Sequence, residues 1–133
     1  MGDRANVQIV QQGGGVVNFY THWSGYRLPE IVRLALAHKQ RWDDGDYLGR
    51  IVFCEMLKAQ GKDALDETTG FGIGNSMGDN DGYPVIVLDP RAGAISFERG
   101  GRAAGVPAAA LDSLARYTFT EYAALDCAEW PEH

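Results

Sequence analysis

The first pattern along the chain is an alternation of polar and apolar side chains over residues 6–11, which is typical of a half-buried strand. Three glycines at 13–15 follow, and glycine readily adopts the positive φ angles of a tight turn. Residues 16–22 are then rich in Val, Phe and Tyr. Together these features predict a β-hairpin over residues 5–22.

Two helical patterns come next. Pro29 suits the first position of a helix, and an apolar stripe predicts that this helix runs from about 29 to 39. An acidic linker, whose side chains can cap a helix, leads to a second pattern from Tyr47 that ends at Gly61. Because the second pattern is more apolar all round, we expect its helix to be the better buried of the two.

The following third of the chain predicts three strands. Phe71, Ile73 and Met77 alternate with small residues and predict a glycine-rich strand over residues 71–77. Residues 84–89 form the clearest buried strand, and residues 94–99 form another. Turn residues over 78–83 and 90–93 separate them. Short turns of this kind favour hairpins, so residues 70–99 are predicted to form a three-stranded antiparallel meander.

The C-terminal part predicts helix. An alanine-rich helix is expected from Pro107 to about Arg116. Thr118 and Glu121 have the spacing of a capping box, which would open a last helical turn or two through Leu125. Trp130 is expected to lie in an exposed tail.

This order of elements lacks the strict βαβ alternation of a parallel sheet. It predicts a single α+β domain over residues 1–133. Its sheet would be mostly antiparallel, made of the N-terminal hairpin and the three-stranded meander, with helices packed on one face.

Charge narrows the class of partner. The chain has 133 residues, 18 of them acidic and 12 basic, for a net charge of −6. This disfavours a nucleic-acid duplex or an anionic membrane surface as partner. No apolar run of about eighteen residues could span a bilayer, and the N-terminus lacks the pattern of a signal peptide. We therefore expect a cytoplasmic protein.

Three features of the sequence suggest cofactor or metal sites but lack the spacing or the ligands that such sites require. The stretch GFGIG at 70–74 lacks the spacing of a nucleotide loop and no helix begins after it. GDNDG at 78–82 has oxygen ligands, but Pro90 stands where a calcium loop needs a glutamate. Cys54 and Cys127 match no metal spacing, and Cys54 is expected to be a buried thiol. No cofactor and no metal is therefore expected.

The stretch NFYTHWSGYRLPE, residues 18–30, concentrates aromatic and polar side chains. On a strand, Trp23 would share a face with Phe19 and form a core pair, while Tyr20 and His22 would lie together on the other face. If the hairpin loop is centred on the glycine turn, residue 22 lies opposite roughly residue 6. Arg4 should then lie close to His22.

These positions give a candidate ligand site of Arg4, Tyr20, His22 and Tyr26. The guanidinium would hold an anionic group, the tyrosines would stack on the ligand, and the imidazole would donate a hydrogen bond. The alternative reading is that His22 merely bonds a neighbour and anchors the strand.

The same stretch resembles a group of small, largely uncharacterised bacterial and phage proteins. Their pattern has Thr-Arg before the first strand and Tyr-x-His-Trp-Asp-Gly-Tyr-Pro after the second. Arg4, the Tyr-x-His-Trp run at 20–23, Gly25 and Tyr26 match it, whereas Ser24 replaces the Asp and Arg27 the Pro. The resemblance covers residues 2–36 and implies an origin in phage or mobile-element genomes.

Two functions remain open. The first is a non-enzymatic binding protein that captures a small anionic, nucleotide-like ligand or a host protein. The second is a small hydrolase or phosphodiesterase using His22 as general acid or base, which would need a carboxylate or second histidine within hydrogen-bonding distance. Asp79 or Asp81 could approach from the meander and supply that carboxylate. A homodimer is also expected, because an exposed Trp130 and an alanine-rich helix would form a contact surface.

Overall fold

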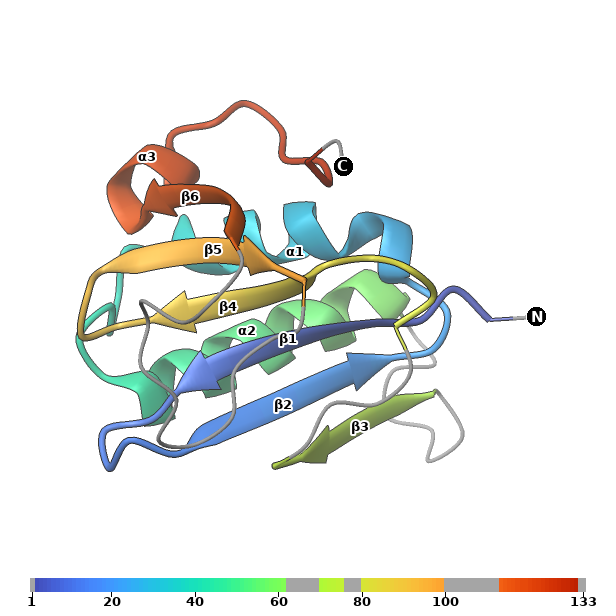
Figure 1. Cartoon of the computed structure of the whole chain (residues 1–133), viewed down its shortest axis with the longest axis horizontal. Helices are drawn as coiled ribbons and strands as arrows, with labels where there is room; N and C mark the ends of the chain where they lie inside the picture. The colour runs from blue at the N-terminus through green and yellow to red at the C-terminus, as the bar shows by residue number, and fades with distance from the viewer. Residues whose placement is uncertain (1, 62–69, 76–79, 100–112, 132–133) are drawn as a thin grey trace.

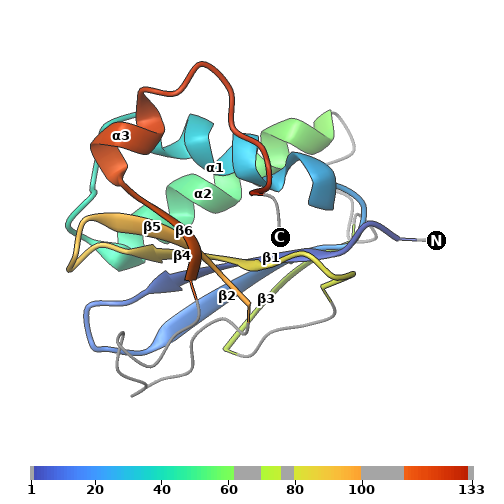
Figure 2. The same cartoon turned by 45° about the horizontal axis from the view of Figure 1, so that its top comes forward.

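The computed structural model describes residues 2–61, 70–75, 80–99 and 113–131. A six-stranded sheet carries its helices on one face (Figures 1 and 2). The α+β prediction is therefore confirmed. The strands are β1 (Ala5–Val10), β2 (Val16–Thr21), β3 (Phe71–Gly74), β4 (Val85–Asp89), β5 (Ala94–Glu98) and β6 (Ser113–Thr118). The helices are the 3-10 helix η1 (Gly25–Arg27), α1 (Leu28–Leu36), α2 (Gly45–Gln60) and α3 (Phe119–Ala123).

The sheet has the strand order β3-β2-β1-β4-β5-β6. The predicted N-terminal hairpin is confirmed, with Asn6 opposite Tyr20, so its register differs by two residues from the predicted one. Gly14 in its turn has φ +91°. The pair β1–β4 is parallel, and all other neighbouring strands are antiparallel.

The predicted three-stranded meander is correct in its strands and wrong in their order. β4 and β5 are antiparallel neighbours joined by the predicted turn. β3, however, pairs with β2 at the opposite edge of the sheet. The position beside β4 is taken by β1, whose six residues are all buried. Met77 and the first residues of the predicted 78–83 turn lie outside the described residues.

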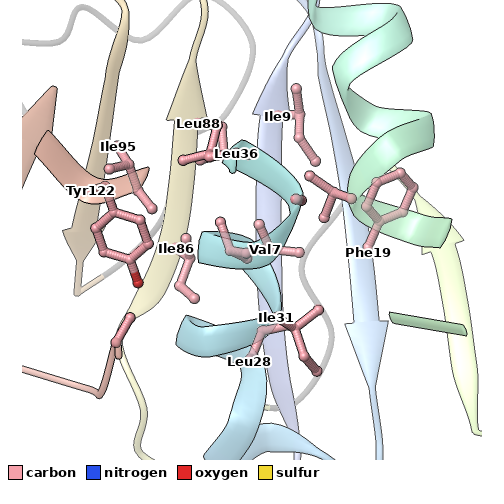
Figure 3. Close-up of a cluster of buried hydrophobic side chains, with 14 of the residues drawn as sticks. Val7, Ile9, Phe19, Leu28, Ile31, Leu36, Ile86, Leu88, Ile95 and Tyr122 are labelled. Atoms are coloured by element: carbon pink, nitrogen blue, oxygen red, sulfur yellow. The ribbon is translucent and has the colours of Figure 1, made fainter. Parts of the chain in front are cut away.

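The core lies between the sheet and the helices (Figure 3). α1 is buried along most of its length, whereas α2 presents one stripe to the sheet: Gly45, Leu48, Gly49, Val52 and Met56. The expectation that the second helix is the better buried is therefore wrong. Cys54 lies off that stripe and is exposed, contrary to the prediction of a buried thiol. As predicted from the acidic linker, a carboxylate caps α2: Asp44 accepts a hydrogen bond from the Tyr47 N–H.

The C-terminal part differs from the predicted helix. Residues 107–112 lie outside the described residues, and residues 113–116 belong to strand β6 rather than to a helix. Ala115 and Tyr117 alternate onto the core, and this packing outweighs the helical preference of the alanines. The predicted capping box is confirmed, because Thr118 and Glu121 bond each other's backbone N–H groups at the start of α3.

Trp130 is packed rather than exposed. Its ring stacks on Tyr83 at 4.6 Å between centroids, and its indole N–H donates to the Gly25 carbonyl over 2.9 Å. Neither feature that suggested a homodimer is therefore present as predicted within the described part of the chain, and the dimer itself stays a prediction. In the described residues, no helix is long and apolar enough to cross a membrane.

Candidate functional site

An open cleft of about 520 Å³ lies where three distant segments of the chain meet. It is lined by Gly2, Asp3, Arg4, His22, Asp81 and Tyr83. The hairpin brings the first two segments together, and the Asp3 N–H donates to the His22 carbonyl over 2.6 Å. The turn before β4 supplies the third, since β4 runs beside β1. Arg4 and His22 thus line one cleft, close together as the hairpin predicted.

Arg4 is tied to Asp81. Its Nε and Nη2 lie 3.0 and 2.8 Å from Asp81 Oδ1, and its backbone N–H donates to Oδ2 over 2.7 Å. The hydrogen bonds from Arg4, with the guanidinium charge, hold the pKa of the Asp81 carboxyl below its usual range. Asp81 has φ +43°, a left-handed conformation uncommon for residues other than glycine. The positive charge of Arg4 is therefore compensated by the Asp81 carboxylate within the cleft.

Asp3 is the second carboxylate of the cleft, and its partners are uncharged. Tyr83 Oη donates to Asp3 Oδ1 over 2.7 Å, and the Tyr26 N–H donates to Oδ2 over 2.8 Å. The Asp3 carbonyl accepts from the Gly25 N–H. A Cβ at Gly25 would lie 2.6 Å from that carbonyl oxygen, so the approach needs a glycine there. Asp3 is thus held rigidly with its negative charge uncompensated by these partners.

His22 is positioned by aromatic neighbours. Its Nδ1 lies 2.8 Å from Tyr20 Oη, and its ring packs edge-on against Trp23 at 4.3 Å between centroids. On the other side the ring touches the backbone of Gly2, where a Cβ would come within 2.6 Å of Nε2. These contacts fix the imidazole at the rim of the cleft.

A row of amides on the sheet face away from the helices positions the 80–83 turn. Asn18 donates to Asn6 over 2.8 Å, and Asn6 donates to Asn80 over 3.0 Å. Asn80 in turn bonds the Tyr83 carbonyl. Asn6 and Asn18 are buried, so the row is rigid. It therefore fixes the turn that carries Asp81.

Two of the four predicted ligand residues do not line this cleft. Tyr20 lies behind His22, and the side chain of Tyr26, 64% exposed, lines a different depression with Arg27 and Leu34. Trp23 is 50% exposed and is not the core partner of Phe19 that the alternation predicted. The strand ends at Thr21, so the alternation does not extend to Trp23.

Asp3 and Tyr83 are absent from the predicted site, and Asp81 enters the prediction only as a carboxylate that could approach His22 in the hydrolase hypothesis. The approach of Asp3 and Asp81 depends on the parallel pairing of β1 and β4, which no local pattern indicates. No local pattern indicated Tyr83.

The charges of the lining side chains limit the chemistry. Asp3 and Asp81 stand against Arg4, so these described residues give the cleft a net negative charge. Within the described ranges, no carboxylate or second histidine is hydrogen-bonded to His22, which the hydrolase hypothesis would require. No group of three His, Cys, Asp or Glu side chains that could hold a metal occurs in that part of the chain either.

Tyr83 gives the cleft a testable pH dependence. Burial, the hydrogen bond to Asp3 and the nearby carboxylates raise the pKa of Tyr83 to about 12. The neutral phenol is thus favoured in the folded state. Its contribution to stability should be fully present below about pH 10, the ordinary tyrosine value, and be lost as the pH rises through about 12.

Denaturant unfolding of the native chain and of Tyr83→Phe from neutral to alkaline pH measures this contribution. The stability difference between them should shrink across that window. Asp3→Asn removes the charge beside Tyr83 and should move the phenolate absorbance titration toward lower pH. A stability difference that stays constant with pH would contradict the assignment.

Taken together, the geometry describes a rigid, aromatic-rimmed, acidic cleft built from three segments. The resemblance to bacterial and phage proteins stays a prediction. In comparisons with protein-family models, curated protein sequences and solved structures, no match to this chain was found.

Proposed function

We propose that the protein is a binding protein whose cleft receives a cationic group, the guanidinium or ammonium of an Arg or Lys side chain on a partner protein. The observation that carries this proposal is the Asp3 carboxylate, which lines the cleft and is bonded by uncharged groups. A cation placed against it would gain a charge-assisted hydrogen bond.

The rim of the cleft suits the same ligand. Trp23 is half-exposed and packs edge-on against His22, which lines the cleft. Aromatic faces attract arginine and lysine side chains through cation–π interaction. The negative net charge of the chain would steer a basic partner toward it. The anionic ligand predicted from Arg4 is less well supported, because such a ligand would have to compete with Asp81.

The test is a two-dimensional amide NMR titration with N-acetyl-arginine amide as the probe. We expect shifts at Asp3, His22 and Trp23, and a loss of affinity of about ten-fold in Asp3→Asn, since a charged hydrogen-bond partner is removed. Asp126→Asn is the matched control, because it removes one exposed carboxylate outside the cleft.

Two results would contradict the proposal: no shifts at the cleft, or equal weakening in Asp3→Asn and Asp126→Asn. A parallel titration with adenosine monophosphate tests the anionic ligand. Shifts centred on Arg4 with the nucleotide, and none with the arginine probe, would favour the anionic ligand instead.

A further inference from the structure

A second cavity, of about 250 Å³, lies between the segment that follows α1 and the outer face of α2. It shares no lining residue with the acidic cleft. It is lined by His38, Gln40, Tyr47, Arg50, Ile51, Cys54, Glu55 and Lys58. The six residues from α2 follow helical spacing and form the face turned away from the sheet. This cavity differs from the acidic cleft because cations prevail in it.

At the edge of this cavity, two arginines lie over the aromatic ring of Tyr47. The guanidinium carbon of Arg41 lies 4.6 Å from the centroid of the Tyr47 ring, and that of Arg50 lies 5.9 Å from it. Among the described residues, neither guanidinium forms an ion pair with a carboxylate. In a chain with six surplus acidic charges, two adjacent arginines without such a partner are unexpected. Both guanidinium groups are therefore available to an anionic ligand at this edge of the cavity.

Glu55 is bonded to His38 and Lys58. Its Oε1 lies 2.7 Å from His38 Nε2 and 3.2 Å from Lys58 Nζ. Burial raises the pKa of Glu55, but the hydrogen bonds from His38 and Lys58 outweigh burial and hold that pKa below its usual range. The carboxylate therefore stays ionised and compensates one charge. Among the lining side chains, Arg50 and Lys58 exceed this negative charge by one, and Arg41 lies at the edge of the cavity beside Tyr47.

The backbone before α2 is shaped to present these side chains. Lys39 and Arg41 have φ angles of +55° and +60°, in the left-handed region that residues other than glycine rarely adopt. Trp42 holds this conformation, because its indole N–H donates to the Leu36 carbonyl over 3.1 Å and its ring packs on Phe119. Strained backbone of this kind concentrates at functional sites.

We infer that this cavity is an anion site that binds the phosphate group of a small phosphate-bearing ligand. A planar guanidinium donates two parallel hydrogen bonds to phosphate oxygens, and the Lys58 ammonium adds a mobile charge. The cavity is large enough for a phosphate or pyrophosphate group. This site shares no lining residue with the acidic cleft, so the experiments on the two sites can fail independently of each other.

The two cysteines of the chain allow a direct test. Cys54 lines the cavity, whereas Cys127 lies beside the Glu30 carboxylate, and both are exposed. Each thiol is alkylated with anionic iodoacetate and with neutral iodoacetamide, and the two rates are measured by mass spectrometry. The ratio of iodoacetate to iodoacetamide rate should be higher at Cys54 than at Cys127, on the order of ten-fold at low ionic strength.

Variants and a competitor complete the test. Arg50→Gln should lower the ratio at Cys54, whereas Arg116→Gln, on the sheet face away from the helices, should leave it unchanged. Inorganic pyrophosphate should slow the iodoacetate reaction at Cys54 more than sodium chloride of equal ionic strength does. Equal ratios at the two cysteines, or equal protection by pyrophosphate and chloride, would overturn the proposal.

Discussion

Replacing Phe97 with alanine is expected to lower the free energy of unfolding by about 3–5 kcal/mol, the range for a fully buried aromatic side chain. Phe97 is 1% exposed, and its ring packs against those of Tyr117, Tyr122 and Trp130. Its loss would open a cavity where β5, β6, α3 and the C-terminal segment meet. Denaturant unfolding monitored by circular dichroism measures the change.

Trp23→Ala is the informative comparison. Half of the Trp23 side chain is exposed, so its removal should cost only about 1 kcal/mol. The alternation along residues 18–23 predicts the reverse, with Trp23 as the core residue. A loss at Trp23 as large as that at Phe97 would contradict the described end of β2 at Thr21.

The second large effect is expected at Gly45, the first residue of α2. A Cβ there would overlap the backbone carbonyl oxygen of Val10 and lie 3.1 Å from its carbon. Because the obstacle is backbone, it cannot rotate away, and Gly45→Ala should cost about 1–3 kcal/mol or more. Thermal and denaturant unfolding of the variant measures this cost.

Gly49→Ala, one turn further along the same helix, is its matched control. A Cβ there would meet the Phe19 ring at 3.6 Å, an ordinary van der Waals contact. Alanine is favoured over glycine inside a helix by about 1 kcal/mol, so this variant should be more stable than the native chain. If both variants lose stability equally, the close approach of α2 to the end of β1 is not what requires Gly45.

Features that depend on neighbouring residues could be predicted from the sequence. The glycine turn specifies the N-terminal hairpin, and Thr118 with Glu121 specifies the start of α3. The apolar run at 85–89 is a buried strand as predicted. In each case the backbone hydrogen bonds or the burial pattern follow from a few adjacent side chains.

Features that depend on distant pairing could not be predicted in this way. No local pattern distinguishes β3 beside β2 from β3 beside β4, because both are antiparallel pairings of the same strand. The alanine content of the region around residues 113–116 favours helix, yet β5 offers an edge on which these residues pair. The exposure of Cys54 likewise depends on which stripe of α2 meets the sheet.

The candidate site also combines residues placed by local sequence with residues placed by distant strand pairing. Arg4 and His22 come together because one hairpin carries both, and hairpin register follows from the turn. Asp81 and Tyr83 arrive through the parallel pair of β1 and β4, which joins segments almost eighty residues apart. The acidic character of the cleft depends on this pairing, and with it the sign of the charge that a ligand would carry.

The central position of β1 has a consequence for how the chain folds. The β1–β2 hairpin closes over a short loop and can form early, within microseconds. Its other edge, however, remains open until β4 has been synthesised and has crossed back to lie beside it. Until then a strand with one apolar face, made of Ala5, Val7 and Ile9, exposes unpaired backbone groups, which is the usual route to intermolecular association. Folding should therefore slow at the docking of β4, and chains truncated before residue 85 should aggregate although the hairpin is intact.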